Sequence, residues 1–262
     1  MSRDDLYGYY RRYYVPNNAT LVIVGDVDAD DAFRRADRQF GGIQPGADVA
    51  RVRTIEPEQT GERRLTIRKE GTTAYWKAAF HAPSATDDRF VPLLVLDAVL
   101  TGAKGLNLWS SFRVSPPQRS ARLYRALVER GLASSVSGSI VPTEQPFLYT
   151  VSATATDGTR LGDLEAVMIQ ELDRVAAEGI TESELRRAQA QLRARLVFEN
   201  DSVTNIAHQL GYFETIAATD VFRTAPSAIA EVTVADVAAA AQAMLASSNR
   251  TVGWYEPLPP TP

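Results

Sequence analysis

The sequence predicts an α+β fold in which an antiparallel β-sheet carries its helices on one face. Stretches of alternating apolar and polar residues form two groups, at 62–80 and 136–156, with a helical stretch between them. Longer stretches with apolar residues three and four positions apart follow the second group. Strands and helices are therefore grouped instead of alternating regularly, which is typical of α+β domains.

The beginning and the end of the chain share one pattern. Residues 2–25 and 233–256 align without a gap at an offset of 231, and the matching pairs are Ser2 with Thr233, Asp5 with Asp236, Leu6 with Val237, Asn18 with Asn249, Thr20 with Thr251 and Leu21 with Val252. In both copies a hydroxyl N-cap with a carboxylate three residues later begins a helix. An Asn-containing turn then leads into a short apolar run that is typical of a buried strand, 21–24 in the first copy.

This repeat predicts two homologous domains in tandem, because its period is too long for a solenoid. Residues 1–45 are then the C-terminal tail of an upstream homology unit, 46–61 a linker, 62–256 a complete domain and 257–262 a Pro-rich tail. The strand at 19–24 would lack most of its own domain, so we expect it to pair with another copy of the chain or to dock on the second domain. A chance similarity within one domain is the alternative.

The acidic run that begins at Asp26 has two interpretations. A calcium-binding EF-hand loop would need Gly at its sixth position and Glu at its twelfth, where Asp31 and Asp37 stand. We therefore expect Asp28 or Asp30 to cap a helix over 31–40, with the acidic groups at its positive N-terminal end. Consecutive glycines at 41 and 42 end this helix.

The complete unit is expected to begin with two half-buried strands joined by a turn at 70–71. Leu65 and Ile67 alternate with polar residues in the first strand. In the second, Trp76 and Phe80 belong to a set of apolar residues that alternates with Tyr75, Lys77 and Ala79. A helix follows from Phe90 to residues 101–102. Residues 103–119 have no clean period and carry exposed aromatic residues, so they form either a binding loop or an apolar lid on their own domain.

The remaining elements follow from glycine stops, alternation and capping. A capping box from Thr181 to Glu184 begins a long helix. The expected elements are a helix over 120–129 ended by Gly131, strands over 136–141 and 147–156, a helix between Gly158 and Gly179, a long helix from 182, a helix over 203–215 and the closing repeat.

The bulk composition excludes several classes of function. With 262 residues, 45% hydrophobic and 23% charged, the chain is typical of a soluble globular protein. A net charge of −4 gives no indication of nucleic-acid binding, and no apolar run approaches the roughly 20 residues of a membrane-spanning helix. The absence of cysteine excludes disulfides, thiol catalysis and thiolate metal sites. The compartment, cytoplasmic or periplasmic, stays open.

No catalytic constellation is visible in the residues. His81 and His208 are far apart in the sequence, and neither has a second His or a Glu at metal-ligand spacing. No nucleophile elbow and no glycine-rich phosphate loop occurs. We therefore predict no catalytic residue, metal site or cofactor in this chain, and we expect both histidines to be structural or surface residues.

Three segments, in order, resemble the pitrilysin/insulinase-like zinc metallopeptidases, the group that includes the mitochondrial processing peptidase. They are YVPNNATLVIVGDVD at 14–28, RLYRALVERGLA at 122–133 and TESELRRAQA at 181–190. The resemblance implies paired homologous α+β domains that form a hollow clamp, with zinc held in one domain by H-x-x-E-H and a downstream Glu. This chain would be the non-catalytic C-terminal domain, which closes the chamber and helps to bind polypeptide substrate for a catalytic domain in cis or in trans.

The resemblance also marks positions for substrate binding. Non-catalytic domains of the family often place an Arg four residues before the glycine of the second segment and a Tyr three residues after it, where this chain has Leu127 and Ser134. Arg122, Tyr124 and Arg125 are the candidate replacements, and packing or surface charge is the alternative for them.

In such a domain, a polypeptide substrate could add along a sheet edge, at 62–68 or 74–80, because backbone hydrogen bonds form with many different peptide sequences.

Two other hypotheses stay open. One is a non-proteolytic assembly subunit, like the core subunits of the respiratory bc complex, and the other is an unrelated enzyme.

Overall fold

The computed structural model describes residues 1–50, 54–106 and 118–259. Within them a five-stranded sheet has the order β1-β5-β2-β4-β3. The strands are β1 (Arg63–Glu70), β2 (Tyr75–Ala82), β3 (Ala133–Ile140), β4 (Phe147–Ala155) and β5 (Arg250–Leu258). The helical elements of this unit are α3 (Phe90–Leu100), the π turn η2 (Tyr124–Val128), α4 (Leu161–Glu178), α5 (Glu182–Glu199), α6 (Val203–Ile216), α7 (Thr219–Glu231), α8 (Val234–Met244) and the 3-10 turn η3 (Ser247–Asn249).

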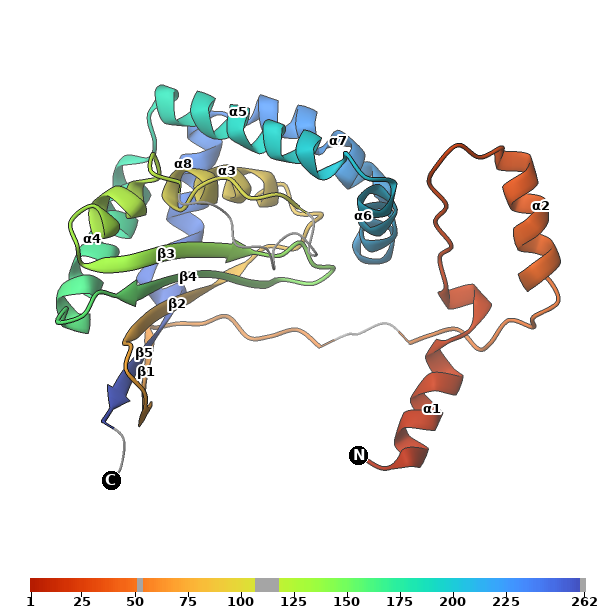
Figure 1. Ribbon diagram of the computed structural model, residues 1–262, viewed down its shortest axis with the longest axis horizontal. Helices are drawn as coiled ribbons and strands as arrows, with labels where there is room; N and C mark the ends of the chain where they lie inside the picture. Colours follow the sequence, from red (N-terminus) through yellow and green to blue (C-terminus); the bar gives the residue numbers. More distant parts are fainter. Residues whose placement is uncertain (51–53, 107–117, 260–262) are drawn as a thin grey trace.

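The helices lie on one face of the sheet, so the predicted α+β class is confirmed (Figure 1). The opposite face, which we call the helix-free face, carries no described helix. The sheet is mixed, however, and not wholly antiparallel. β5 runs parallel to β1 and antiparallel to β2. Alternation of side chains does not encode strand direction, and these parallel strands are the first and last elements of the unit.

The core lies between the sheet and the helices. Trp76, Ala78 and Phe80 on β2 alternate with exposed or half-buried residues and are fully buried, as are Tyr149 and Val151 on β4. α3 is apolar on nearly all sides because it packs against α5, α7 and α8 as well as against the sheet. This central position explains why the α3 sequence lacks a polar stripe.

β1 differs from the half-buried strand that its sequence predicts, because all eight of its residues are exposed. Arg64 contacts Glu165 on α4, so the alternate residues Leu65 and Ile67 point to the helix-free face. β1 is also one of the two edge strands of the described sheet, the other being β3, and it pairs only with β5. The alternation of apolar and polar residues in β1 therefore does not mean burial, because the apolar side chains of this strand are exposed.

Two helical segments differ from the sequence prediction. α7 was not predicted, since Pro226 lies inside it, although Phe222, Ala225 and Ile229 are buried at helical spacing. The predicted helix over 120–129 contains the π turn η2, in which Leu127 is buried and Arg125 exposed. None of the described helices is long and apolar enough to cross a membrane.

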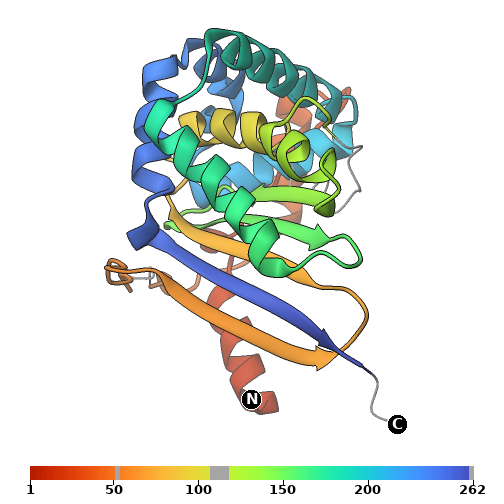
Figure 2. The same ribbon diagram turned by 90° about the vertical axis from the view of Figure 1, so that its left-hand side faces the viewer.

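Residues 1–50 extend away from the complete unit (Figure 1), and from the opposite side α1 is seen behind the sheet (Figure 2). They contain α1 (Arg3–Tyr13), the 3-10 turn η1 (Pro16–Asn18) and α2 (Ala29–Phe40). The carboxylate of Asp28 accepts a hydrogen bond of 2.8 Å from the Asp31 amide, which confirms the expected capping role of this aspartate. Neither α1 nor α2 has a buried residue.

The predicted strand at 21–24 is absent. The segment is extended but has no strand partner, and Leu21 and Ile23 are exposed. Val22 touches α6, where its Cγ2 lies 3.5 Å from the position of a Cβ added to Gly211. A strand needs a neighbour for its backbone groups, and the described chain supplies none here. The expected docking of residues 19–24 on the second domain is thus limited to the side of Val22. Pairing of this segment with a second copy of the chain stays a prediction.

The two copies of the repeat nevertheless have the same local structure. Ser2 with Asp5, and Thr233 with Asp236, form reciprocal capping boxes at the start of α1 and α8. A 3-10 turn follows each helix. In each turn an Asn side chain, Asn18 or its counterpart 231 positions later, donates a hydrogen bond of 2.9 Å to the carbonyl five residues before it. The tandem-domain organisation that the repeat predicts remains a prediction.

Candidate functional site

The helix-free face of the sheet has an apolar end and a polar end. At the apolar end, the rings of Tyr75 and Tyr255 meet with their centroids 5.8 Å apart, and Ile67 lies opposite Tyr255 in the strand register. At the polar end, hydroxyl groups of β3 and β4 bond across the strands, with 2.9 Å between the Oγ atoms of Ser137 and Ser152. The apolar end adjoins β1, so exposed apolar side chains and a free strand edge coincide there.

Only one of the two predicted peptide-binding edges is an edge. The predicted stretch 62–68 corresponds to β1, whose outer side has no strand neighbour among the described residues. The stretch 74–80 corresponds to β2, which lies between β5 and β4, so this prediction was wrong. The sequence could not show this, because β2 acquires its second neighbour from β5 at the far end of the chain.

Charged side chains hold β1 in place from the helix side. The carboxylate of Glu165 accepts hydrogen bonds from the indole Nε1 atoms of Trp76 at 2.8 Å and Trp254 at 2.5 Å, and from Arg64 Nη2 at 2.7 Å. Burial disfavours the charged form of Glu165, but Arg64 and the two indoles outweigh it, and the pKa of this carboxyl is lowered. Polar contacts thus replace the apolar packing that β1 lacks.

A second carboxylate joins the same network at the start of β1. Buried Arg250 on β5 donates to Glu62 Oε2 at 2.6 and 2.7 Å from two nitrogens, and Arg64 donates to Glu62 Oε1 at 2.6 Å. Burial raises the pKa of Glu62, but Arg250 and Arg64 lower it by more, so the pKa of this carboxyl lies below its ordinary value. Sequence reasoning missed this network, since bonded partners such as Glu62 and Arg250 are 188 positions apart.

The three substrate-binding candidates occupy different environments. Arg122 donates to both carboxylate oxygens of Glu184, at 2.6 and 2.7 Å, and to the Gly179 carbonyl at 3.3 Å. Tyr124 is half-buried and Arg125 is exposed. Arg122 therefore has a structural contact that a substrate would have to replace, and a substrate-binding role for the three residues remains a prediction.

The two positions where the family often has Arg and Tyr are also placed differently. Leu127 is fully buried in the core. Ser134 is exposed near the start of β3, and its hydroxyl donates to the Thr154 carbonyl at 3.3 Å. Leu127 therefore cannot reach a ligand on the surface, whereas Ser134 lies on the edge strand β3.

A buried polar cluster precedes the segment that was expected to form a binding loop or a lid. Asp97 accepts hydrogen bonds from Thr101 Oγ1 at 2.6 Å, Tyr149 OH at 2.9 Å and Lys104 Nζ at 2.8 Å. Burial and the Asp97 carboxylate raise the pKa of Tyr149 well above its ordinary value. A lone Asp in the apolar α3 was the only sequence signal for this cluster. Of the segment 103–119, residues 107–117 lie outside the described residues.

The described residues do not fit a zinc site. His81 lies on β2 and His208 on α6. Among residues 1–50, 54–106 and 118–259, no group of three or more His, Asp or Glu side chains could hold a metal ion. We therefore assign no step of zinc-dependent catalysis to the residues described here.

Comparisons with known proteins place the chain in a family. The family described as the peptidase M16 inactive domain matches residues 1–192. The chain is 24% identical to a probable mitochondrial-processing peptidase subunit beta of Schizosaccharomyces pombe, over 80% of this chain and 45% of that protein. It is 26% identical to an uncharacterized zinc protease of Mycobacterium leprae, over 82% of this chain and 45% of that protein. The chain thus spans about half the length of these relatives.

Solved structures share the fold over nearly the whole chain. A protease from Helicobacter pylori superposes with a TM-score of 0.86, at 17% identity, over 98% of this chain and 60% of the other. A chain of Complex III2 from Candida albicans superposes with a TM-score of 0.76, at 18% identity, over 97% of this chain and 59% of the other. These identities show the fold alone. The matched family, which confirms the resemblance seen in the three sequence segments, shows that this chain belongs to the peptidase M16 inactive-domain family.

Proposed function

We propose that the chain is the non-catalytic half of a zinc-dependent peptidase, which binds extended polypeptide along β1 for cleavage by a catalytic half. The observation that carries this proposal is the exposed edge strand β1, with Leu65 and Ile67 on the helix-free face, in a unit whose described residues hold no metal site. The relatives that are named as peptidases support the reaction class.

The binding step follows from strand geometry. An incoming strand would pair with the outer backbone groups of β1, and these hydrogen bonds are independent of the peptide sequence. Alternate side chains of that strand would lie beside Leu65 and Ile67 and would therefore be selected for apolar character. The contact between Arg64 and Glu165 holds β1 in place before binding, which reduces the entropy that β1 itself loses on binding. Zinc and its activated water would belong to the catalytic half.

Peptide hydrolysis tests the proposal directly. A fluorogenic peptide mixture with zinc is incubated with the chain alone, and then with the polypeptide encoded immediately upstream of it, mixed or fused. We expect cleavage only in the combined sample, and loss of cleavage with a chelator. Zinc-dependent cleavage by the chain alone would contradict the proposal, because the chain would then hold an active metal site of its own.

The second candidate is a non-proteolytic assembly subunit of the same fold. It is favoured by the structural likeness to a chain of Complex III2. No cleavage in either sample, together with a stable complex between the two polypeptides, would support this candidate over the first.

A further inference from the structure

The cations of β1 differ in their partners according to the face of the sheet on which they lie. On the helix side, Arg64 and Arg68 pair with carboxylates of α4 and β5, both at 2.7 Å. On the helix-free face, Arg63 and Lys69 are exposed and form no ion pair with a carboxylate of the described chain. Two positive charges of this strand are thus available to a group from outside.

The strands of the helix-free face carry cations without acidic residues. Lys77 on β2 is exposed, and the strand register places it across Gly253 from Leu65. None of the positions that the register places on this face, in the five described strands, is Asp or Glu. The whole chain has 28 basic and 32 acidic residues, so this face differs in charge from the average of the chain. Its local potential attracts anionic groups.

Along β1, the side chains on the helix-free face follow the order cation, apolar, apolar, cation. Arg63, Leu65, Ile67 and Lys69 stand at alternate positions. Figure 2 shows β1 at the edge of the sheet, with β5 on its inner side. A strand that pairs with this edge places its own alternate side chains opposite these four. The order is the same in both directions, so parallel and antiparallel peptides meet the same neighbours.

We propose that the polypeptide bound along β1 is acidic, with two apolar residues at alternate positions and an Asp or Glu on either side of them, opposite Arg63 and Lys69. This inference rests on the proposed function and names its substrate class. Opposite charges directly across two strands stabilise the pairing, and like charges weaken it. A peptide with Lys or Arg at the two outer positions is therefore selected against.

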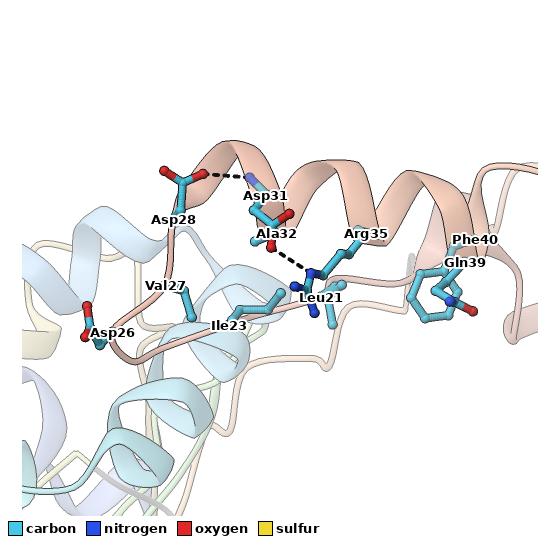
Figure 3. A pocket seen from close by; sticks show the side chains of 11 residues that line it. Leu21, Ile23, Asp26, Val27, Asp28, Asp31, Ala32, Arg35, Gln39 and Phe40 are labelled. Atoms are coloured by element: carbon cyan, nitrogen blue, oxygen red, sulfur yellow. Dashed lines mark hydrogen bonds and ion pairs between the residues drawn. The ribbon is translucent and has the colours of Figure 1, made fainter.

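The groove in the N-terminal part of the chain does not offer the same peptide a second place. About 470 Å³ of space lies between α2 and residues 21–24, and Asp26, Asp28 and Asp31 line it (Figure 3). Arg35, the cation of this lining, is already paired with Asp31 at 2.6 Å. The excess of negative charge repels carboxylates. Charge thus directs an acidic peptide to β1 and away from this groove.

Peptide binding to the chain alone tests this inference independently of catalysis. Fluorescence anisotropy is measured with labelled peptides as long as β1, eight residues. They carry two apolar residues at alternate positions and either Glu or Lys at the two flanking positions. We expect the Glu peptide to bind about tenfold more tightly than the Lys peptide, the combined effect of two cross-strand charge pairs. Salt at about 1 M should remove most of this difference, because it screens exposed charges.

Charge reversal on β1 gives the sharpest comparison. The double variant Arg63→Glu/Lys69→Glu should invert the preference, so that the Lys peptide binds more tightly. The neutral double variant Arg63→Gln/Lys69→Gln should remove the preference. Arg187→Glu/Arg193→Glu makes the same change in net charge as the reversal, at two exposed positions of α5, and should leave the preference intact.

Three results would overturn the inference: no measurable binding of either peptide, equal affinity for both, or a preference that the reversal on β1 leaves unchanged. The last would mean that these cations serve only to keep the strand edge from pairing with other copies. A charge preference in binding, without cleavage by the combined polypeptides, would keep this inference and remove the proteolytic function. Cleavage by the combined polypeptides without a charge preference in binding would do the reverse.

Discussion

At the scale of single residues, Glu165 is the carboxylate on which the position of β1 depends most. Glu165→Gln keeps the size of the side chain but removes the negative charge to which Arg64 and two indoles donate hydrogen bonds. We expect the free energy of unfolding to fall by about 2 kcal/mol, the order of a hydrogen bond to a charged group. Urea denaturation measures this change. Glu178→Gln, an exposed change on the same helix, is the control, and equal losses in both variants would contradict the assigned role.

The Arg122–Glu184 pair predicts a pH dependence of stability. Arg122, together with the amide and hydroxyl of Thr181, lowers the pKa of Glu184 to about 2, from an ordinary value of 4.5. Because the folded-state pKa is depressed, the stabilisation is complete above 4.5 and is lost as pH falls from there to about 2. Glu184→Gln should therefore be less stable than the parent chain near neutral pH, by about 1 kcal/mol after allowance for solvent screening.

Unfolding curves at a series of pH values check this prediction. The difference between parent and Glu184→Gln should shrink as the solution is acidified through the interval between 4.5 and about 2. A difference that stays constant would mean that the lost stability comes from side-chain packing and not from the ionised carboxylate of Glu184.

At the scale of the element, the exposed apolar side of β1 is the feature with a functional consequence. Ile67→Asp puts a charge beside the place of an incoming strand, and we expect KM for peptide to rise by about tenfold in the reconstituted enzyme while kcat changes little. Val197→Asp makes the same kind of change on α5, at a residue that is also highly exposed, and should leave KM unchanged. Parallel effects of the two variants would remove β1 from substrate binding.

The elements also show how far sequence patterns reach. The boundaries of α3, β4 and α5 follow from spacing, glycine stops and a capping box, because these signals are local. β1 and β2 have the same alternation, yet one is fully exposed and the other fully buried on its inner side. Alternation of side chains shows that a strand has an apolar and a polar face. Whether the apolar face is buried depends on elements that lie far away in the sequence.

At the scale of the whole molecule, residues 1–45 and the complete unit should be energetically separable. α1 and α2 contain no buried residue, and Val22 lies near Gly211 of α6. We expect a chain that lacks residues 1–45 to keep the Tm of the complete unit within about 2 °C, since few contacts are lost. Calorimetry measures this, and a large fall in Tm would show that residues 1–45 stabilise the unit.

The sequence by itself determined the α+β class, the family resemblance, the helix caps and the repeat at an offset of 231, because each of these depends on residues close together or in fixed register. Only the tertiary structure decided that β1 runs parallel to β5, that β2 is internal, that Arg122 is paired with Glu184, and that the two copies of the repeat have opposite burial. The physical reason is the same in each case: strand pairing, ion pairing and burial are set by which distant segments become neighbours, and local spacing carries no information on that choice.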